Sequence, residues 1–207
     1  SLYIPVTKKY LKYKLIEKDL EKTEQKFDFK TLLREKLNNE EIESVKTAYD
    51  IVGDIAILEI SRDLKNKKFV AECVLKINKN INTVVCKIGG HEGIFRVQKY
   101  EKLATKNCMA TDKGLETLHT ESGIKIKLDI NKVYFTPRLA SERMRIAKLV
   151  KQDESVLVMF SGVGIYQLII SKYSKAKKIY GVEINPDACK YAEENVKLNK
   201  AKNVKLD

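Results

Sequence analysis

Residues 155–206 carry the pattern that most constrains the fold, because short apolar segments alternate there with helical ones. Strands are predicted over 155–160, over 178–184 and from 203, and helices over 165–175 and 185–200. Asn185 and Pro186 are typical helix starts, since Asn caps free N–H groups and Pro has none to satisfy. Strands and helices joined by such short turns predict the first half of a doubly wound parallel sheet. We expect this chain to be a fragment, truncated at both ends, of a longer protein that completes the sheet.

The first half of the chain predicts a small α+β unit. Helices are expected over 27–47, with Asp28 as cap, and over 62–78; strands are expected as a pair over 49–60, over 83–88 and from 93. Residues 1–26 are strongly charged after a short apolar start and predict a linker or the remnant of an N-terminal domain. We therefore expect an α/β chain, with an α+β middle domain over 27–114 and an incomplete Rossmann-like domain over 115–207.

The second half opens with a hairpin. Ile124, Ile126 and Leu128 alternate with polar residues, which predicts a half-buried strand paired through a turn at 121–123. Pro137 then interrupts regular structure, and a helix is expected from about Ser141.

The charge of the chain bears on its partners. Lys and Arg number 40 against 28 Asp and Glu, a net charge of +12. This excess favours a polyanion, nucleic acid before a membrane surface, although some Lys-rich proteins bind neither. No apolar run is long enough to cross a membrane. The chain has four cysteines, none in a CxxC pair, and only two histidines, a composition that argues against a zinc site. We expect the cysteines to be free thiols and the protein to be cytoplasmic.

A glycine turn and an acidic residue predict a nucleoside site. Gly162 and Gly164 follow the first parallel strand, and Glu183 stands at the end of the second. Such glycines let a ligand approach the backbone, and such a carboxylate binds ribose hydroxyls. A dinucleotide and S-adenosylmethionine both fit, but Gln167 replaces the third glycine of the dinucleotide pattern, which favours S-adenosylmethionine. The alternative is a tight turn beside a surface acid.

Several blocks of the sequence carry a resemblance. They are KVYFTPRLASERMRIA (132–147), VLVMFSGVG, VEINPDACKYAEENVKLNK and, upstream and in order, DIVGDIAILEI (50–60), FRVQKYEKLA (95–104) and HTESG (119–123). This set resembles the archaeal and eukaryotic tRNA (guanine-37-N1)-methyltransferase family, which is related to enzymes of wyosine synthesis. The resemblance implies an RNA-associated middle domain, a catalytic domain that uses S-adenosylmethionine, and a tRNA substrate.

The resemblance also implies the site residues. Its active-site arginine, tyrosine and glutamate correspond to Arg96, Tyr134 and Glu142. Its cofactor site corresponds to Arg138 at the methionine end and to Phe160, Gly162, Gly164, Glu183 and Ile184 around the rest. Asn107 matches in the loop between the two halves.

Methylation of guanine N1 defines what these residues would do. N1 carries a proton, so a base must remove it, and a carboxylate such as Glu142 suits that task if partial burial raises its pKa. A permanently charged guanidinium, Arg96, would stabilise charge on O6. Tyr134 would position the base or stack on the extruded guanine. Without the resemblance, the three residues would pass as a helix-start acid, a surface charge and a core aromatic.

The leading hypothesis is therefore an S-adenosylmethionine-dependent methyltransferase for N1 of guanosine 37 in tRNA. One alternative is a bifunctional enzyme that also methylates a wyosine intermediate at the same nucleotide. Another is a tRNA-binding piece without activity, which is what we expect of the truncated chain itself. An NAD-binding module is a third. We expect a cytoplasmic monomer that uses no metal and no membrane.

Overall fold

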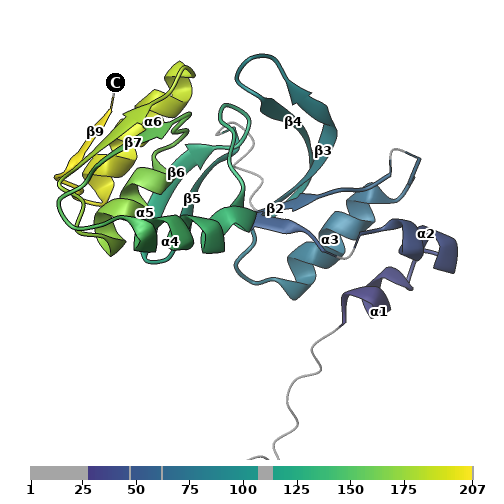
Figure 1. The fold of residues 1–207 in the computed structure, drawn as a ribbon. Coiled ribbons are helices and arrows are strands. Elements are labelled where there is room, and N and C mark those ends of the chain that lie inside the picture. The colour runs from purple at the N-terminus through teal and green to yellow at the C-terminus, as the bar shows by residue number, and fades with distance from the viewer. Residues whose placement is uncertain (1–27, 47, 62, 107–113, 207) are drawn as a thin grey trace, which may run out of the picture.

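The computed structural model describes residues 28–46, 48–61, 63–106 and 114–206. The linker expected over 1–26 lies outside the described residues, as do Asn107 and Cys108. Figure 1 shows two halves side by side, one built from α1–α3 and β1–β4 and the other from β5–β9 and α4–α6. No described helix is long and apolar enough to span a bilayer.

The first half is built on a four-stranded sheet in the order β1-β2-β3-β4. The strands are β1 (Asp50–Val52), β2 (Ile55–Leu58), β3 (Thr83–Glu92) and β4 (Val97–Thr105). The predicted strand pair about Gly53 is confirmed as the antiparallel β1–β2 hairpin. β2 and β3 are parallel, and helix α3 (Lys67–Ile77) makes the crossover that parallel strands require. α3 buries Val70, Ala71 and Val74.

The single helix predicted over 27–47 is wrong. Two short helices form instead, α1 (Phe29–Leu33) and α2 (Asn39–Ser44). Asn38 starts the second one: its side chain accepts from the Glu41 N–H at 2.9 Å, and the Glu41 carboxylate accepts from the Asn38 N–H at 2.9 Å. This reciprocal cap ends helical continuity at Asn38. Asp28 stands at the N-cap of α1, but its side chain makes no capping hydrogen bond.

The predicted hairpin is confirmed as β5 (Glu116–Glu121) and β6 (Ile124–Asp129). Its turn residues Ser122 and Gly123 have φ of 48° and 67°. After β6 the chain runs through a 3-10 turn, η2 (Pro137–Leu139), into helix α4 (Ala140–Leu149).

The predicted parallel half-sheet is confirmed. Its strands are β7 (Ser155–Met159), β8 (Lys178–Val182) and β9 (Val204–Leu206), and its helices are α5 (Ile165–Tyr173) and α6 (Pro186–Leu198). The order β7-β8-β9 is parallel throughout. Asn185 caps α6 by accepting from the Asp187 N–H at 3.0 Å.

One apolar core runs through both halves. Val52, Ile57 and Val85 of the first sheet share a buried cluster with residues of β6, α5 and β8, including Ile126, Leu168 and Ile179. A second cluster lies wholly in the first half, between α1, α3 and the face of the sheet that these helices cover. The two halves therefore share buried apolar surface, and the boundary at 114–115 stays a prediction.

Buried polar groups lie close to the same junction. Arg143 of α4 is 2% exposed and donates to both oxygens of Glu121 on β5 at 2.7 and 2.6 Å. Next to that pair, His119 Nδ1 accepts from the Gly53 N–H at 3.1 Å, which ties β5 to the β1–β2 turn. The accepting nitrogen must carry no proton, so this contact requires a neutral imidazole with its proton on Nε2.

We predict that His119 makes stability pH-dependent. Burial lowers the pKa of His119 below its ordinary value of 6.5, and Arg143 adds to this against the opposing charge of Glu121. The unfolded chain therefore takes up the proton first. The contribution of neutral His119 to the free energy of unfolding is therefore complete above pH 6.5. It declines as the pH falls from 6.5 to the lower pKa that His119 has in the folded protein. Urea unfolding at pH 7.5 and 5.5 should show a larger loss in the wild type than in His119→Gln; equal losses would contradict the prediction.

Candidate functional site

The turn between β7 and α5 is a left-handed bend. Phe160, Gly162 and Gly164 have φ of 54°, 55° and 85°, a region that side chains with a Cβ rarely adopt. A Cβ on Gly164 would lie 3.3 Å from that of Ala192, so glycine lets α6 pack against the start of α5. Phe160 adopts this left-handed backbone although it has a Cβ, which strains the backbone there, and its ring is 83% exposed. Strain of this kind clusters at functional sites.

Glu183 fastens this bend to the next strand. Its carboxylate accepts from the backbone N–H groups of Gly162 at 2.7 Å and of Ile184 and Asn185 at 2.9 Å each. The Ser161 N–H also donates to the Val182 carbonyl at 3.0 Å. The ends of β7 and β8 and the start of α6 are thus held together by one half-buried carboxylate.

The segment after β6 lies against the bend. A Cβ on Gly162 would come 3.9 Å from the carbonyl oxygen of Tyr134, and the Asn185 side chain donates to the Lys132 carbonyl at 2.9 Å. These contacts bring Tyr134, a predicted active-site residue, next to the predicted cofactor turn. Tyr134 is 49% exposed.

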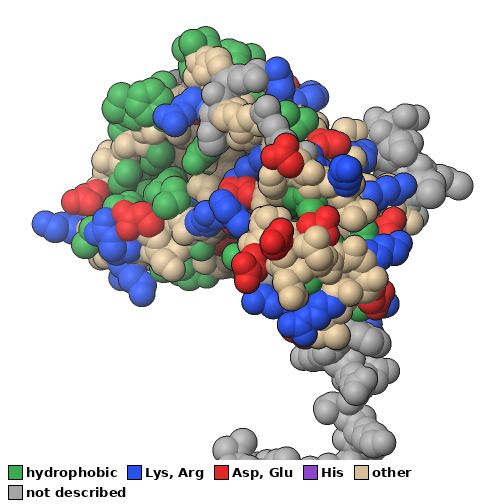
Figure 2. All heavy atoms as spheres, turned by 90° about the vertical axis from the view of Figure 1, so that its right-hand side faces the viewer, with side chains coloured by type: hydrophobic (Ala, Val, Ile, Leu, Met, Phe, Trp, Pro, Cys, Tyr) green, Lys and Arg blue, Asp and Glu red, His purple; other side chains and the backbone are tan. Residues whose placement is uncertain are grey.

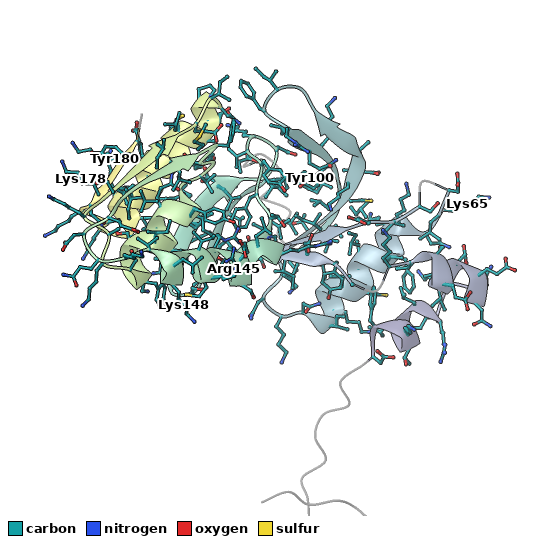
Figure 3. The ribbon with its side chains drawn as sticks, viewed as in Figure 1. Lys65, Tyr100, Arg145, Lys148, Lys178 and Tyr180 are labelled. Carbon is teal, nitrogen blue, oxygen red and sulfur yellow. The ribbon has the colours of Figure 1, made fainter. Side chains whose placement is uncertain are left out.

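A cavity of about 260 Å³ opens along this segment, at the junction of the two halves. Tyr134 and Arg138 line it from the second half, and Asp50, Gln98 and Tyr100 line it from the first sheet. Figure 3 shows Tyr100 between the two halves. Burial raises the pKa of the Tyr100 phenol to about 12, with further contributions from the Asp50 carboxylate and Tyr134. Tyr100 therefore stays protonated at neutral pH.

Glu142 does not have the raised pKa that we expected. It stands in the first turn of α4 with a side chain that is 41% exposed, and Arg145 donates to it through Nε at 2.7 Å and Nη2 at 2.8 Å. These hydrogen bonds lower the pKa of Glu142. The expectation of a raised pKa is wrong because the hydrogen bonds from Arg145 outweigh the opposing effect of burial.

Arg96 lies in the turn between β3 and β4, with φ of 51°. The turn is exposed, and Ile94 beside it is 76% exposed. Within the described residues, neither Arg96 nor Glu142 contacts the glycine bend through a hydrogen bond or ion pair. In Figure 1 the turn of the β3–β4 hairpin lies at the top of the view and α4 lies at the lower edge of the second half. The structure thus joins Tyr134, Gly162, Gly164 and Glu183, and among the described residues no hydrogen bond or ion pair links Arg96 or Glu142 to them.

Sequence reasoning missed the contribution of the first sheet. Asp50, Gln98 and Tyr100 reach the cavity from strands far away in the sequence, and no local pattern marks them. Gln167, which replaces the third glycine of the dinucleotide pattern, is fully buried against Gly181 of β8. A Cβ on Gly181 would collide with the Gln167 amide. The glycine that lets α5 pack closely on the sheet is therefore Gly181 on the strand, and the helix itself carries Gln167 at the place of the third glycine. No group of three or more His, Cys, Asp or Glu side chains in the described segments could hold a metal.

Comparison with known proteins agrees with this architecture. Residues 117–206 match the TRM5/TYW2 methyltransferase domain, and residues 29–107 match the TYW2 N-terminal domain. This chain belongs to the TRM5/TYW2 family. The predicted fold class, an α+β unit followed by the first half of a Rossmann-like class I methyltransferase sheet, is confirmed by its structural relatives.

Three TRM5/TYW2 relatives are informative. The tRNA (guanine(37)-N(1))-methyltransferase Trm5b of Pyrococcus abyssi is 43% identical over 159 residues, covering 76% of this chain and 46% of the relative. The structure of the complex of aTrm5 and tRNALeu has a TM-score of 0.77 at 35% identity, covering 93% of this chain and 57% of that one. TYW2 of M. jannaschii in complex with AdoMet has a TM-score of 0.53 at 29% identity, covering 77% and 55%. The chain spans about half the length of these relatives.

We predict that Gly164→Ala destabilises the fold. A left-handed residue with a Cβ costs about 1–2 kcal/mol, and the methyl group would press on Ala192. Gly90→Ala is the matched control, because a Cβ there meets nothing within 4 Å. Urea unfolding should show a lower free energy of unfolding for Gly164→Ala, and a change within roughly 0.5 kcal/mol for the control. An unchanged Gly164→Ala would show that the bend does not need its left-handed glycine.

Proposed function

We propose that this protein methylates N1 of guanosine 37 in tRNA, with S-adenosylmethionine as the methyl donor. The observation that carries the proposal is the left-handed bend held by Glu183 beside Tyr134, in a chain of the TRM5/TYW2 family. The name of the P. abyssi relative supports the reaction, and the aTrm5 complex supports tRNA as substrate. A cytoplasmic location and a monomeric state stay predictions.

The residues present fit a sulfonium nucleoside. At Gly162 and Gly164 no side chain keeps a ligand from the backbone, and the Glu183 carboxylate, oriented by backbone N–H groups, would accept from ribose hydroxyls. Phe160 and Ile184, 83% and 67% exposed, offer apolar surface on either side for the adenine. Arg138 would bind the carboxylate at the methionine end. AdoMet in the M. jannaschii TYW2 structure supports this assignment. When bound, the cofactor supplies an electrophilic methyl group.

The remaining residues act on the purine in this proposal. Tyr134, half exposed at the bend, would stack on the extruded guanine. Glu142 would take the N1 proton, and Arg96 would donate to O6 as charge develops there. Arg145 currently holds the Glu142 carboxylate, which keeps it ionised but makes it a weaker base. A phosphate of the RNA would compete with Glu142 for Arg145 and release the base.

The surface charge suits an extended RNA contact better than one basic patch. Figure 2 shows acidic and basic side chains intermixed on the face of the first half. On the second half, Arg145 and Lys148 lie on α4, as Figure 3 shows, and residues 172–178 form a dense basic run. We propose that these groups contact tRNA phosphates. Each such contact would make the affinity for tRNA fall more steeply with salt concentration.

A second candidate function is aminocarboxypropyl transfer to a wyosine precursor, or methylation of such a precursor at the same nucleotide. It is favoured by the match of residues 29–107 to a domain named for TYW2. Mass analysis of nucleoside 37 after reaction distinguishes the two, because a methyl group and an aminocarboxypropyl group add different masses. A tRNA-binding protein without activity would leave nucleoside 37 unchanged.

We predict that Glu142→Gln in the full protein lowers the rate of methyl transfer by about 10²–10⁴-fold, because an amide cannot accept the N1 proton. Binding of tRNA should be retained. The assay measures labelled methyl transfer to tRNA with guanosine or adenosine at position 37, with Glu193→Gln, an exposed acid on α6, as matched control. Transfer to the adenosine tRNA would contradict the proposed function, and full activity of Glu142→Gln would remove Glu142 from the base role.

We also predict that Arg145→Ala shifts the pH dependence of turnover. The pKa of Glu142 is lowered by hydrogen bonds from Arg145, so without them it returns toward its ordinary value. A base works only when deprotonated, so the acidic limb of kcat/KM should move to higher pH in the variant. The pH profile of Lys148→Ala provides the control for loss of a neighbouring positive charge. An unmoved limb in Arg145→Ala would show that Glu142 does not govern it.

A further inference from the structure

One ion pair joins the two halves inside the cavity. Arg138, in η2, donates through Nε to Asp50 Oδ1 at 2.7 Å, and Asp50 is the first residue of β1. The Asp50 side chain is 17% exposed and that of Arg138 is 63% exposed. The aspartate is thus the fixed partner, and the arginine is the one that faces solvent and the cavity.

Asp50 is held in place by its strand. It pairs with Ile57 of β2, and its carboxylate lies close enough to Tyr100 to disfavour ionisation of that phenol. A largely buried carboxylate needs a cationic partner, because its desolvation is otherwise uncompensated. The position of Asp50 therefore determines where the guanidinium of Arg138 sits.

The ion pair uses one edge of the guanidinium only. A guanidinium has five N–H donors, and a carboxylate ligand typically takes two of them in parallel. Asp50 takes the donor on Nε, and within the described residues the Nη nitrogens of Arg138 have no hydrogen-bond partner. The end of the guanidinium is left available for a second carboxylate at the wall of the cavity.

We propose that Asp50 is a positioning residue for ligand binding: it orients Arg138 so that the Nη pair receives the carboxylate of an α-amino acid group. This inference rests on the proposed function, in which that group is the methionine end of S-adenosylmethionine. Because Asp50 belongs to the first sheet, the amino acid end of the cofactor site is complete only when the two halves are docked. The nucleoside end, built from the glycine bend and Glu183, lies wholly within the second half.

Two nucleoside ligands separate these ends. S-adenosylhomocysteine carries the amino acid carboxylate, whereas 5′-methylthioadenosine has the same nucleoside and no amino acid. Calorimetric titration of the full protein should show that Asp50→Ala weakens S-adenosylhomocysteine roughly 10-fold, the usual effect of a lost hydrogen bond to a charged group. The affinity for 5′-methylthioadenosine should stay within about twofold of the wild type, since the nucleoside end is untouched.

Asp50→Asn, which preserves side-chain volume, serves as the second variant if Asp50→Ala lowers the melting temperature. In an Arg138→Ala background, Asp50→Ala should cause no further loss, because a positioning residue acts through the residue that it positions. Equal weakening of both ligands would indicate a structural role, and unchanged binding of both would show that Arg138 needs no such partner. Either result overturns the inference about Asp50 and leaves the proposed function standing. Failure of the wild type to bind either ligand would overturn the proposed cofactor site as well.

Discussion

The carboxylate of Glu183 is the interaction on which the candidate site depends. By accepting from Gly162, Ile184 and Asn185, it joins the end of β7 to the end of β8 and the start of α6. Three hydrogen bonds to an anion are stronger than three to a neutral group, so the left-handed bend is held although Phe160 within it is strained. In the proposed function the same oxygen atoms accept from the ribose hydroxyls, so the group that shapes the turn would also bind the ligand.

The second constraint is the docking of the two halves. A shared apolar core and the Gly53–His119 hydrogen bond hold the first sheet against the second half, where the buried Arg143–Glu121 pair joins α4 to β5. The cavity lined by Tyr100, Tyr134 and Arg138 exists only because of that docking. Stability and site geometry are therefore coupled, and groups such as Asp50 contribute to both.

In the part of the chain that the structure describes, no hydrogen bond or ion pair links Arg96 or Glu142 to the bend, and this bears on how the reaction would proceed. Arg96 is exposed and the side chain of Glu142 is 41% exposed. Arg96, like Phe160, holds a left-handed backbone without being glycine. Backbone strain at two residues singled out for function is an observation independent of the sequence pattern. In the proposed reaction the RNA itself completes the active site, by drawing Arg145 from Glu142 and by placing the purine between the hairpin and Tyr134.

The sequence by itself determined the local structure of the second half and its glycine turn. The strand–helix order over 155–206, the Asn185 cap and the distance from Gly162 to Glu183 are encoded over short spans, where periodicity and turn chemistry decide the outcome. It did not determine the break at Asn38, because the capping box competes with a helical apolar pattern that runs past it. Only the tertiary structure decided which partner Arg138 has, how exposed Glu142 is and which strands line the cavity. Those contacts join residues far apart in the sequence, and they follow from the packing of one half on the other, which no local pattern records.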